Sequence, residues 1–215
     1  KHLRNTATPN SPFLERVIVL LRGANKYCCF TFADNKYLFA DSLCVIASSS
    51  YEVFAFLSSD IHAIWAFEYG SRREERLSYT PTTVFETFPF ACDLTGNQVS
   101  ERISALGREL FETRSEYLLT HDLGMTKFYN EFHDPRRAAP DICRLRDIQC
   151  EMNLAVKDAY GFDDLDLEIG FHKVAYLPES KNVLFTVGEA AREKLLFKLS
   201  TLNKVRYAGK DHGNE

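Results

Sequence analysis

Short apolar runs of strand length dominate the beginning of the chain. They span residues 16–22, 26–32 and 36–47, and the turn-forming pair Asp34-Asn35 separates the last two. This pattern predicts a small, mostly antiparallel sheet. The segment before it, 1–15, opens with a polar stretch, and we expect it to be loose.

The apolar spacing then changes from that of a strand to that of a helix. Ser49 and Glu52 have the spacing of a capping box, and Gly70 is a typical helix end. The pattern predicts one long helix between them, with an apolar stripe formed by Phe54, Leu57, Ile61, Ile64 and Trp65. We expect Trp65 to be structural and His62 to be a hydrogen-bonded helix histidine rather than a ligand.

Residues 93–97 mark a boundary, beyond which the pattern is mainly helical. Three helices are predicted, over 99–117, 140–161 and 186–207. Pro140 and Asp141 open the second, with Asp141 as its N-cap, and Thr186 and Glu189 cap the third.

The predicted fold class is therefore α+β: a small, mostly antiparallel sheet with a long helix, followed by a mainly helical C-terminal subdomain. We divide the chain into a loose segment (1–15), a first domain (16–95) and a helical C-terminal domain (96–215).

Composition limits the classes of function. The 215 residues, 45% of them hydrophobic, are enough for one good core or two small ones. The net charge of −4 argues against a basic nucleic-acid binder as a whole. Any affinity for nucleic acid must come from a local face.

Cysteine usage and hydropathy point to the cytoplasm. The six cysteines form no C-x-x-C pair, which argues against a zinc site and a disulfide framework and favours free thiols. No apolar run approaches the roughly 18 residues of a membrane span, and no secretory signal opens the chain. Because the chain begins at Lys1, we expect a fragment or a processed product.

The stretch 62–90, HAIWAFEYGSRREERLSYTPTTVFETFPF, combines two aromatic runs with a charged turn between them. The aromatic residues are those of core or interface packing. The arginines of the turn either neutralise the adjacent glutamates in a solvated loop or grip a nucleic acid. The turn consists of Arg72, Arg73, Glu74, Glu75 and Arg76.

This stretch resembles the target-recognition region of large single-chain bacterial DNA adenine methyltransferases of type II restriction-modification systems, the MmeI-like and type IIG enzymes. The matching positions are Ser58, Ser59, His62, Trp65, Ala66, Gly70, Ser71, Tyr79, Thr80, Pro81, Thr82, Phe85, Glu86, Thr87, Phe88, Pro89 and Phe90. Ser78 and Ala91 depart from the family pattern. Residues 104–134, 141–167 and 199–210 are also similar to family segments, with departures at Asn153 and Phe162.

The resemblance implies DNA contact through the charged turn. It places base readers at the positions of Glu74 and Arg76. Arginine can bind guanine N7 and O6 together, and glutamate can accept from cytosine N4. The candidate DNA-binding residues are Arg72, Arg73, Glu74, Arg76, Tyr79, Thr80, Arg22 and Lys26. Tyr27, beside Lys26, and Thr82, which like Thr80 could donate to a phosphate, are further candidates.

The catalytic motifs of that family do not occur in this sequence. There is no F-x-G-x-G loop for S-adenosylmethionine, no N-P-P-[YF] motif for a flipped adenine and no nuclease motif. We therefore name no catalytic, cofactor-binding or metal-binding residue. S-adenosylmethionine is expected in a catalytic domain outside this chain.

The sequence thus predicts the target-recognition and C-terminal part of a DNA adenine-N6 methyltransferase of a restriction-modification system. Its expected partners are double-stranded DNA and an upstream methyltransferase domain of the same polypeptide, with no membrane. The alternative is a protein-interaction module that docks its aromatic and arginine surface on a partner domain without touching DNA.

Overall fold

The computed structural model describes residues 14–23, 25–73, 76–92, 94, 100–177, 179 and 182–211; for residues 72–73 and 209–211 it describes the backbone alone. Most of the segment expected to be loose, 1–15, lies outside the described residues. The predicted α+β class is confirmed: small antiparallel sheets accompany six helices, and the chain is mostly helical after residue 100. None of the described helices is long and apolar enough to cross a membrane.

The first sheet has three antiparallel strands in the order β2-β1-β3. They are β1 (Arg16–Leu21), β2 (Thr31–Asp34) and β3 (Leu43–Ile46). Ile18 in the middle strand lies opposite both Phe32 and Ile46. The second and third predicted runs are strands only at their C-terminal ends. Before β2 the chain leaves the sheet, because Asn25 forms a bridge to Leu77 instead.

The prediction of one long helix that ends at Gly70 is wrong in one respect. The segment forms two helices, α1 (Tyr51–Ser58) and α2 (Asp60–Tyr69). Ser59 between them has an extended backbone, and its hydroxyl accepts a hydrogen bond from the backbone N–H of His62, which caps α2. The predicted capping box is also wrong. Ser50 caps α1, and the carboxylate of Glu52 accepts a 2.8 Å hydrogen bond from the backbone N–H of Ser100.

A short hairpin follows α2. Its strands are β4 (Ser71–Arg73) and β5 (Arg76–Ser78), which pair with Arg73 opposite Arg76. This hairpin contains the charged turn identified in the sequence.

The three helices predicted in the second half are present as α3 (Glu101–Thr120), α5 (Pro140–Ala159) and α6 (Glu189–Asp211). Val99, the expected start of the first, lies outside the described residues, and Ser100 caps α3. Asp141 is not an N-cap; Ala139 holds that position, and a carboxylate oxygen of Asp141 lies 2.9 Å from Nε2 of His121.

Two parts of the second half were not predicted. They are the short helix α4 (Met125–Phe132) and a hairpin of β6 (Gly170–Lys173) with β7 (Val183–Thr186). Thr186, predicted to cap a helix, is the last residue of β7.

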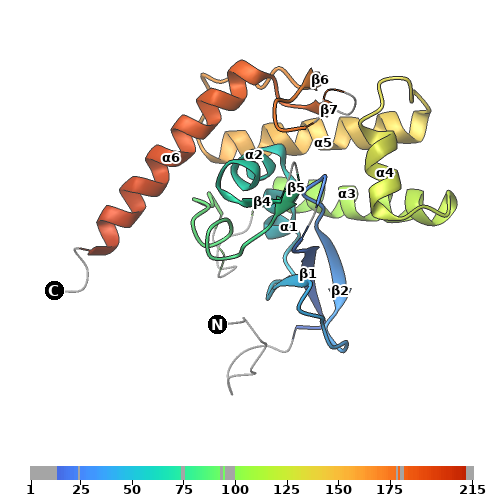
Figure 1. Ribbon diagram of the computed structural model, residues 1–215, viewed down its shortest axis with the longest axis horizontal. Helices are drawn as coiled ribbons and strands as arrows, with labels where there is room; N and C mark the ends of the chain where they lie inside the picture. The colour runs from blue at the N-terminus through green and yellow to red at the C-terminus, as the bar shows by residue number, and fades with distance from the viewer. Residues whose placement is uncertain are drawn as a thin grey trace.

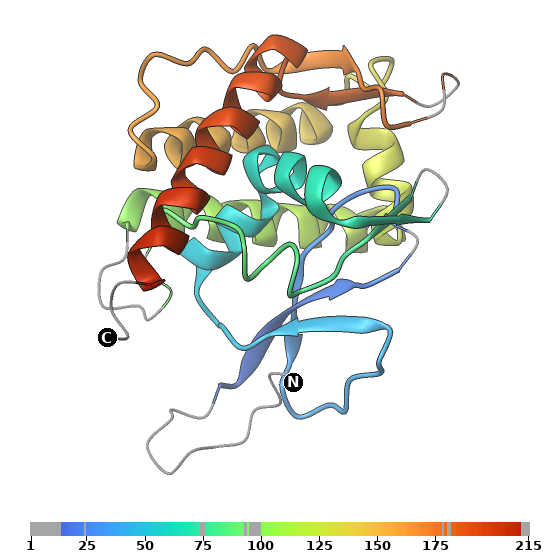
Figure 2. The ribbon, with the colours of Figure 1, turned by 60° about the vertical axis from the view of Figure 1, so that its left-hand side comes forward.

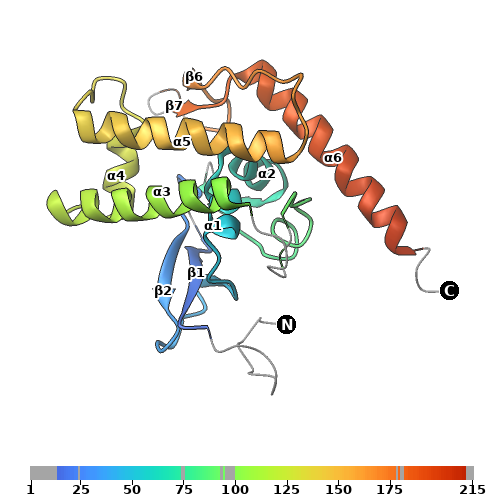
Figure 3. The same ribbon diagram turned by 180° about the vertical axis from the view of Figure 1, so that it is seen from behind.

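One continuous core joins the first sheet to the helices. It includes Ile18 of β1, Phe54 of α1, Leu110 of α3, Leu145 of α5 and Leu195 of α6. Helices α3 and α5 lie side by side behind α1 and α2, and the three-stranded sheet extends from this helical body (Figures 1 and 3). Helix α6 runs outward at the end opposite α4 in both views.

Candidate nucleic-acid interface

A buried side chain, that of Leu77, helps to fix the β4–β5 hairpin to the body. Leu77 is fully buried between exposed Arg76 and half-buried Ser78, as expected when side chains alternate along a strand. Arg76 is therefore directed to solvent while its neighbour enters the core. The side chains of Arg72 and Arg73, and the whole of Glu74, lie outside the described residues.

A second segment is joined to this hairpin. Asn25 and Leu77 exchange two backbone hydrogen bonds, of 2.9 and 2.8 Å, and the backbone N–H of Tyr79 donates to the carbonyl of Arg22 at 2.7 Å. The segment between β1 and β2 consequently lies along β5 (Figure 2). The structure thus brings Arg22, Lys26 and Arg76 to neighbouring backbone segments, although they are far apart in sequence.

Lys26 has a defined position. Its Nζ donates to Oδ1 of Asn130 on α4 at 3.2 Å, and the same oxygen accepts from the hydroxyl of Tyr27 at 3.0 Å. Nζ of Lys26 also lies 4.7 Å from the centre of the Tyr27 ring. Tyr27 itself is buried, stacks on His133, and has its pKa raised by burial. We therefore assign Tyr27 a positioning role rather than a contact with a ligand.

Tyr79 was a candidate for DNA contact, but it is 1% exposed. Its hydroxyl lies 3.0 Å from Nε2 of His62, which is itself fully buried. Burial lowers the pKa of His62 to about 3, so this histidine is neutral. Because both groups face the core, we leave Tyr79 out of the interface proposed below.

The two aromatic runs contribute to the core, as the packing interpretation predicts. Trp65 is 1% exposed, and its indole N–H donates to the hydroxyl of Thr87 at 3.3 Å. Phe67, Phe88 and Phe90 are buried as well. Thr80 is half-buried and its carbonyl accepts from the backbone N–H of Val84 at 2.9 Å, while Thr82 is exposed.

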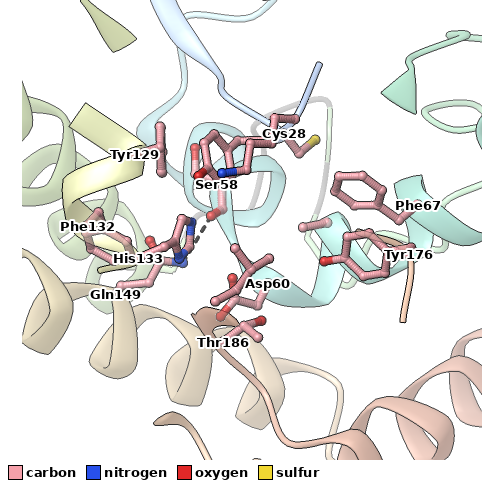
Figure 4. A pocket seen from close by; sticks show the side chains of 14 residues that line it. Cys28, Ser58, Asp60, Phe67, Tyr129, Phe132, His133, Gln149, Tyr176 and Thr186 are labelled. Atoms are coloured by element: carbon pink, nitrogen blue, oxygen red, sulfur yellow. Dashed lines mark hydrogen bonds between the residues drawn. The ribbon is translucent and has the colours of Figure 1, made fainter. Parts of the chain in front are cut away.

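A small cavity lies where α1, α2, α4, α5 and β7 meet, and Lys26 and Tyr27 of the loop after β1 also line it (Figure 4). Its volume is about 50 Å³, room for a few water molecules. Asp60 is its acidic residue: the side-chain amide of Asn153 donates to the carboxylate at 2.8 Å. Burial raises the pKa of Asp60 to about 7, with hydrogen bonds from Asn153 and Thr186 acting in the opposite direction.

The cavity does not have the arrangement of a catalytic centre. Its histidine, His133, uses Nδ1 to accept from the backbone N–H of Phe185 at 3.0 Å, and burial lowers its pKa to about 3. Within the described parts of the chain, no group of three His, Cys, Asp or Glu side chains could hold a metal ion. We interpret the cavity as a structural joint between the first helices and α5.

Comparison with known families identifies residues 18–92 as a match to a target recognition domain of restriction-modification enzymes. The family is that of MmeI, described as "MmeI, target recognition domain". This confirms the resemblance expected from the sequence and coincides with the segment from β1 to the end of the second aromatic run.

A solved structure supports the same relationship at the level of the fold. It is that of the Type IIL restriction-modification enzyme MmeI in complex with DNA, which matches with a TM-score of 0.62 and 19% identity. The match covers 91% of this chain and 22% of the MmeI chain. No curated protein matches this chain.

Proposed function

We propose that this chain recognises the DNA target of a restriction-modification enzyme that methylates adenine at N6. The observation that supports this most directly is the match of residues 18–92 to the MmeI target recognition domain. The fold over 91% of the chain also resembles a part of MmeI, whose structure was solved with DNA bound.

The hairpin has the chemistry for base recognition. Arg76 is exposed, and no ion pair joins it to another residue that the structure describes. A planar guanidinium can donate to N7 and O6 of guanine in the major groove. We assign base reading to Arg76 and Glu74, with Arg72 and Arg73 beside them on the same hairpin.

The surrounding residues would hold the duplex in register. Arg22 and Lys26 lie on the segment bonded to β5, and Thr80 lies two residues after the end of β5. Their cationic and hydroxyl groups suit phosphate oxygens, which give affinity but carry no sequence information. A local cluster of this kind allows DNA binding by a chain whose net charge is −4.

The methyl transfer itself requires groups that this sequence does not contain. An adenine must be flipped out of the duplex before its amino group can be modified. We assign that step, and S-adenosylmethionine binding, to an upstream methyltransferase domain of the same polypeptide. The role of this chain is to hold the duplex while the base is out.

The competing function is docking on a partner protein through the same arginines. Duplex binding by the chain, measured by fluorescence anisotropy across a salt series, separates the two. For the proposed function we expect affinity to fall linearly with salt on a log–log scale, and selection from a random duplex pool to enrich one motif. Absence of binding at low salt would reject DNA recognition and leave the docking function.

Arg102→Ala is a matched control for Arg76→Ala in this assay. Arg102 is an exposed arginine on α3, with an ion pair to Asp158. We expect Arg76→Ala, and not Arg102→Ala, to weaken binding to the selected motif.

A further inference from the structure

Helix α4, which contacts Lys26 of the candidate nucleic-acid interface, carries two exposed polar side chains and one exposed lysine. Thr126, Lys127 and Asn130 are exposed on it, and they share one face because they are three and four residues apart. We infer that this face of α4 is a second DNA contact, which binds the phosphate backbone next to the segment read by the β4–β5 hairpin. The inference rests on the proposed function and extends it.

Hydrogen bonds connect this face to the hairpin step by step. Leu77 of β5 is bonded to Asn25 through two backbone hydrogen bonds. The next residue, Lys26, donates to the side chain of Asn130 at 3.2 Å. Lys127 lies one turn earlier on the same face. Hairpin, loop and helix thus form one continuous surface with cationic groups from each element.

The charge of this face is not neutralised from within the helix. Glu131 is the only acidic residue of α4, and it is already engaged: Arg137 binds one carboxylate oxygen at 2.9 Å and the Tyr117 hydroxyl donates to the other at 2.7 Å. No ion pair involves Lys127 among the residues that the structure describes. The exposed side of α4 is therefore cationic.

The opposite side of α4 holds the helix in place. Phe128 and Phe132 are buried, and the hydroxyl of Tyr129 accepts from the buried Arg114 at 3.0 Å. Because the helix is anchored along its length, Thr126 and Lys127 keep a constant offset from the hairpin. A surface ordered before binding loses less entropy when it binds.

The chemistry of the face suits phosphates rather than bases. Lysine offers a compact charge without the planar fork that reads guanine. Asn130 has a different role. Its side chain accepts a hydrogen bond from Lys26, so it positions the lysine that contacts the DNA phosphate backbone. We therefore expect this face to add affinity at every sequence and to leave sequence preference unchanged.

The test compares Lys127→Ala with Lys204→Ala in the full chain. Lys204 is an exposed lysine on α6, at the end of the molecule opposite α4 (Figures 1 and 3). Binding is measured with the selected motif and with a random duplex at several salt concentrations. We expect Lys127→Ala to lower the affinity for the selected motif and for the random duplex by the same factor. The slope of log affinity against log salt should become less steep by about 1. Lys204→Ala should match the wild-type chain.

Asn130→Ala tests the positioning role, with a thermal melt to establish that the variant is folded. This substitution should also lower the affinity for both duplexes equally. The double variant Lys26→Ala/Asn130→Ala should bind DNA no more weakly than Lys26→Ala alone.

The outcomes separate this inference from the proposed function. If the wild-type chain binds no DNA, the proposed function fails. If it binds its motif and Lys127→Ala behaves like Lys204→Ala, the second contact is rejected and the function stands. A change of sequence preference in Lys127→Ala would also reject a backbone contact.

Discussion

Asn25 and Leu77 exchange two backbone hydrogen bonds, of 2.9 and 2.8 Å, and so join the loop after β1 to the candidate DNA-reading hairpin. One candidate phosphate contact, Lys26, follows Asn25, and the candidate base reader Arg76 precedes Leu77. Any displacement of the loop therefore changes the spacing between the two kinds of contact.

This relationship predicts different effects on DNA binding for two substitutions at Asn25. Asn25→Pro removes the backbone N–H that donates to Leu77, because proline has none, whereas Asn25→Ala keeps both backbone bonds. We expect Asn25→Pro to weaken DNA binding and Asn25→Ala to leave it near the wild-type value. Equal affinities for the two variants, measured by fluorescence anisotropy, would show that the bridge does not position the loop.

Arg76→Ala in the methyltransferase that we propose as the parent protein should weaken methylation of the target or relax the preference at one base position. A good bidentate contact contributes roughly 1–3 kcal/mol of discrimination, so a change of about tenfold or more is expected. Sequencing of methylated sites gives the preference, and initial rates give the magnitude. An unaltered pattern and rate would reduce Arg76 to a surface charge.

Trp65→Ala should destabilise the fold by about 3–5 kcal/mol, because it removes a large buried aromatic side chain. The ring is 1% exposed and lies 4.2 Å from the ring of Tyr69, centre to centre. Tyr37→Ala is the control, since Tyr37 is 60% exposed. A thermal melt with an unchanged midpoint for Trp65→Ala would contradict its structural role.

Gly107→Ala should be destabilising, although alanine favours a helix over glycine by about 1 kcal/mol. A Cβ at Gly107 would lie 2.3 Å from the carbonyl oxygen of Tyr51 and 3.0 Å from Cβ of Ala55, so α1 and α3 would have to separate. We expect a net loss of about 1–3 kcal/mol in the free energy of unfolding. Gly23→Ala, where a Cβ meets nothing within 4 Å, should change it little.

The buried carboxyl of Asp60 predicts a specific pH dependence of stability. Its pKa is raised from 3.8 to about 7 in the folded protein. Between these values the folded state retains a proton that the unfolded state has released. The contribution of Asp60 to the free energy of unfolding therefore falls as pH rises from about 4 to 7.

Asp60→Asn isolates this contribution, because asparagine does not titrate. Chemical unfolding at a series of pH values should show the difference in stability, wild type minus variant, declining between about pH 4 and 7 and level outside that range. The histidines His62 and His133, with pKa values lowered to about 3, act in the opposite direction in both proteins, so their contributions cancel in the comparison. A difference that does not vary with pH would contradict the raised pKa.

The spacing of apolar residues along the sequence was sufficient to predict an element where that element is long or its partners are near in sequence. Helices α3, α5 and α6 were predicted because apolar residues recur over about five turns or more. The burial of Trp65 followed from the same periodicity. Helix α4, of eight residues, and the four-residue strands β6 and β7 were missed. Elements this short have little stability of their own.

What the sequence by itself determined was the α+β class, the aromatic core positions and the charged turn with its family resemblance. Tertiary structure decided the rest. The break between α1 and α2 is held by α5: the side chain of Gln149 donates to the carbonyl of Ser58, and the side chain of Asn153 accepts from the backbone N–H of Asp60. Lys26 and Asn130 meet through a hydrogen bond between segments far apart in the chain. Such pairings depend on where the core places each backbone, and no local pattern encodes that placement.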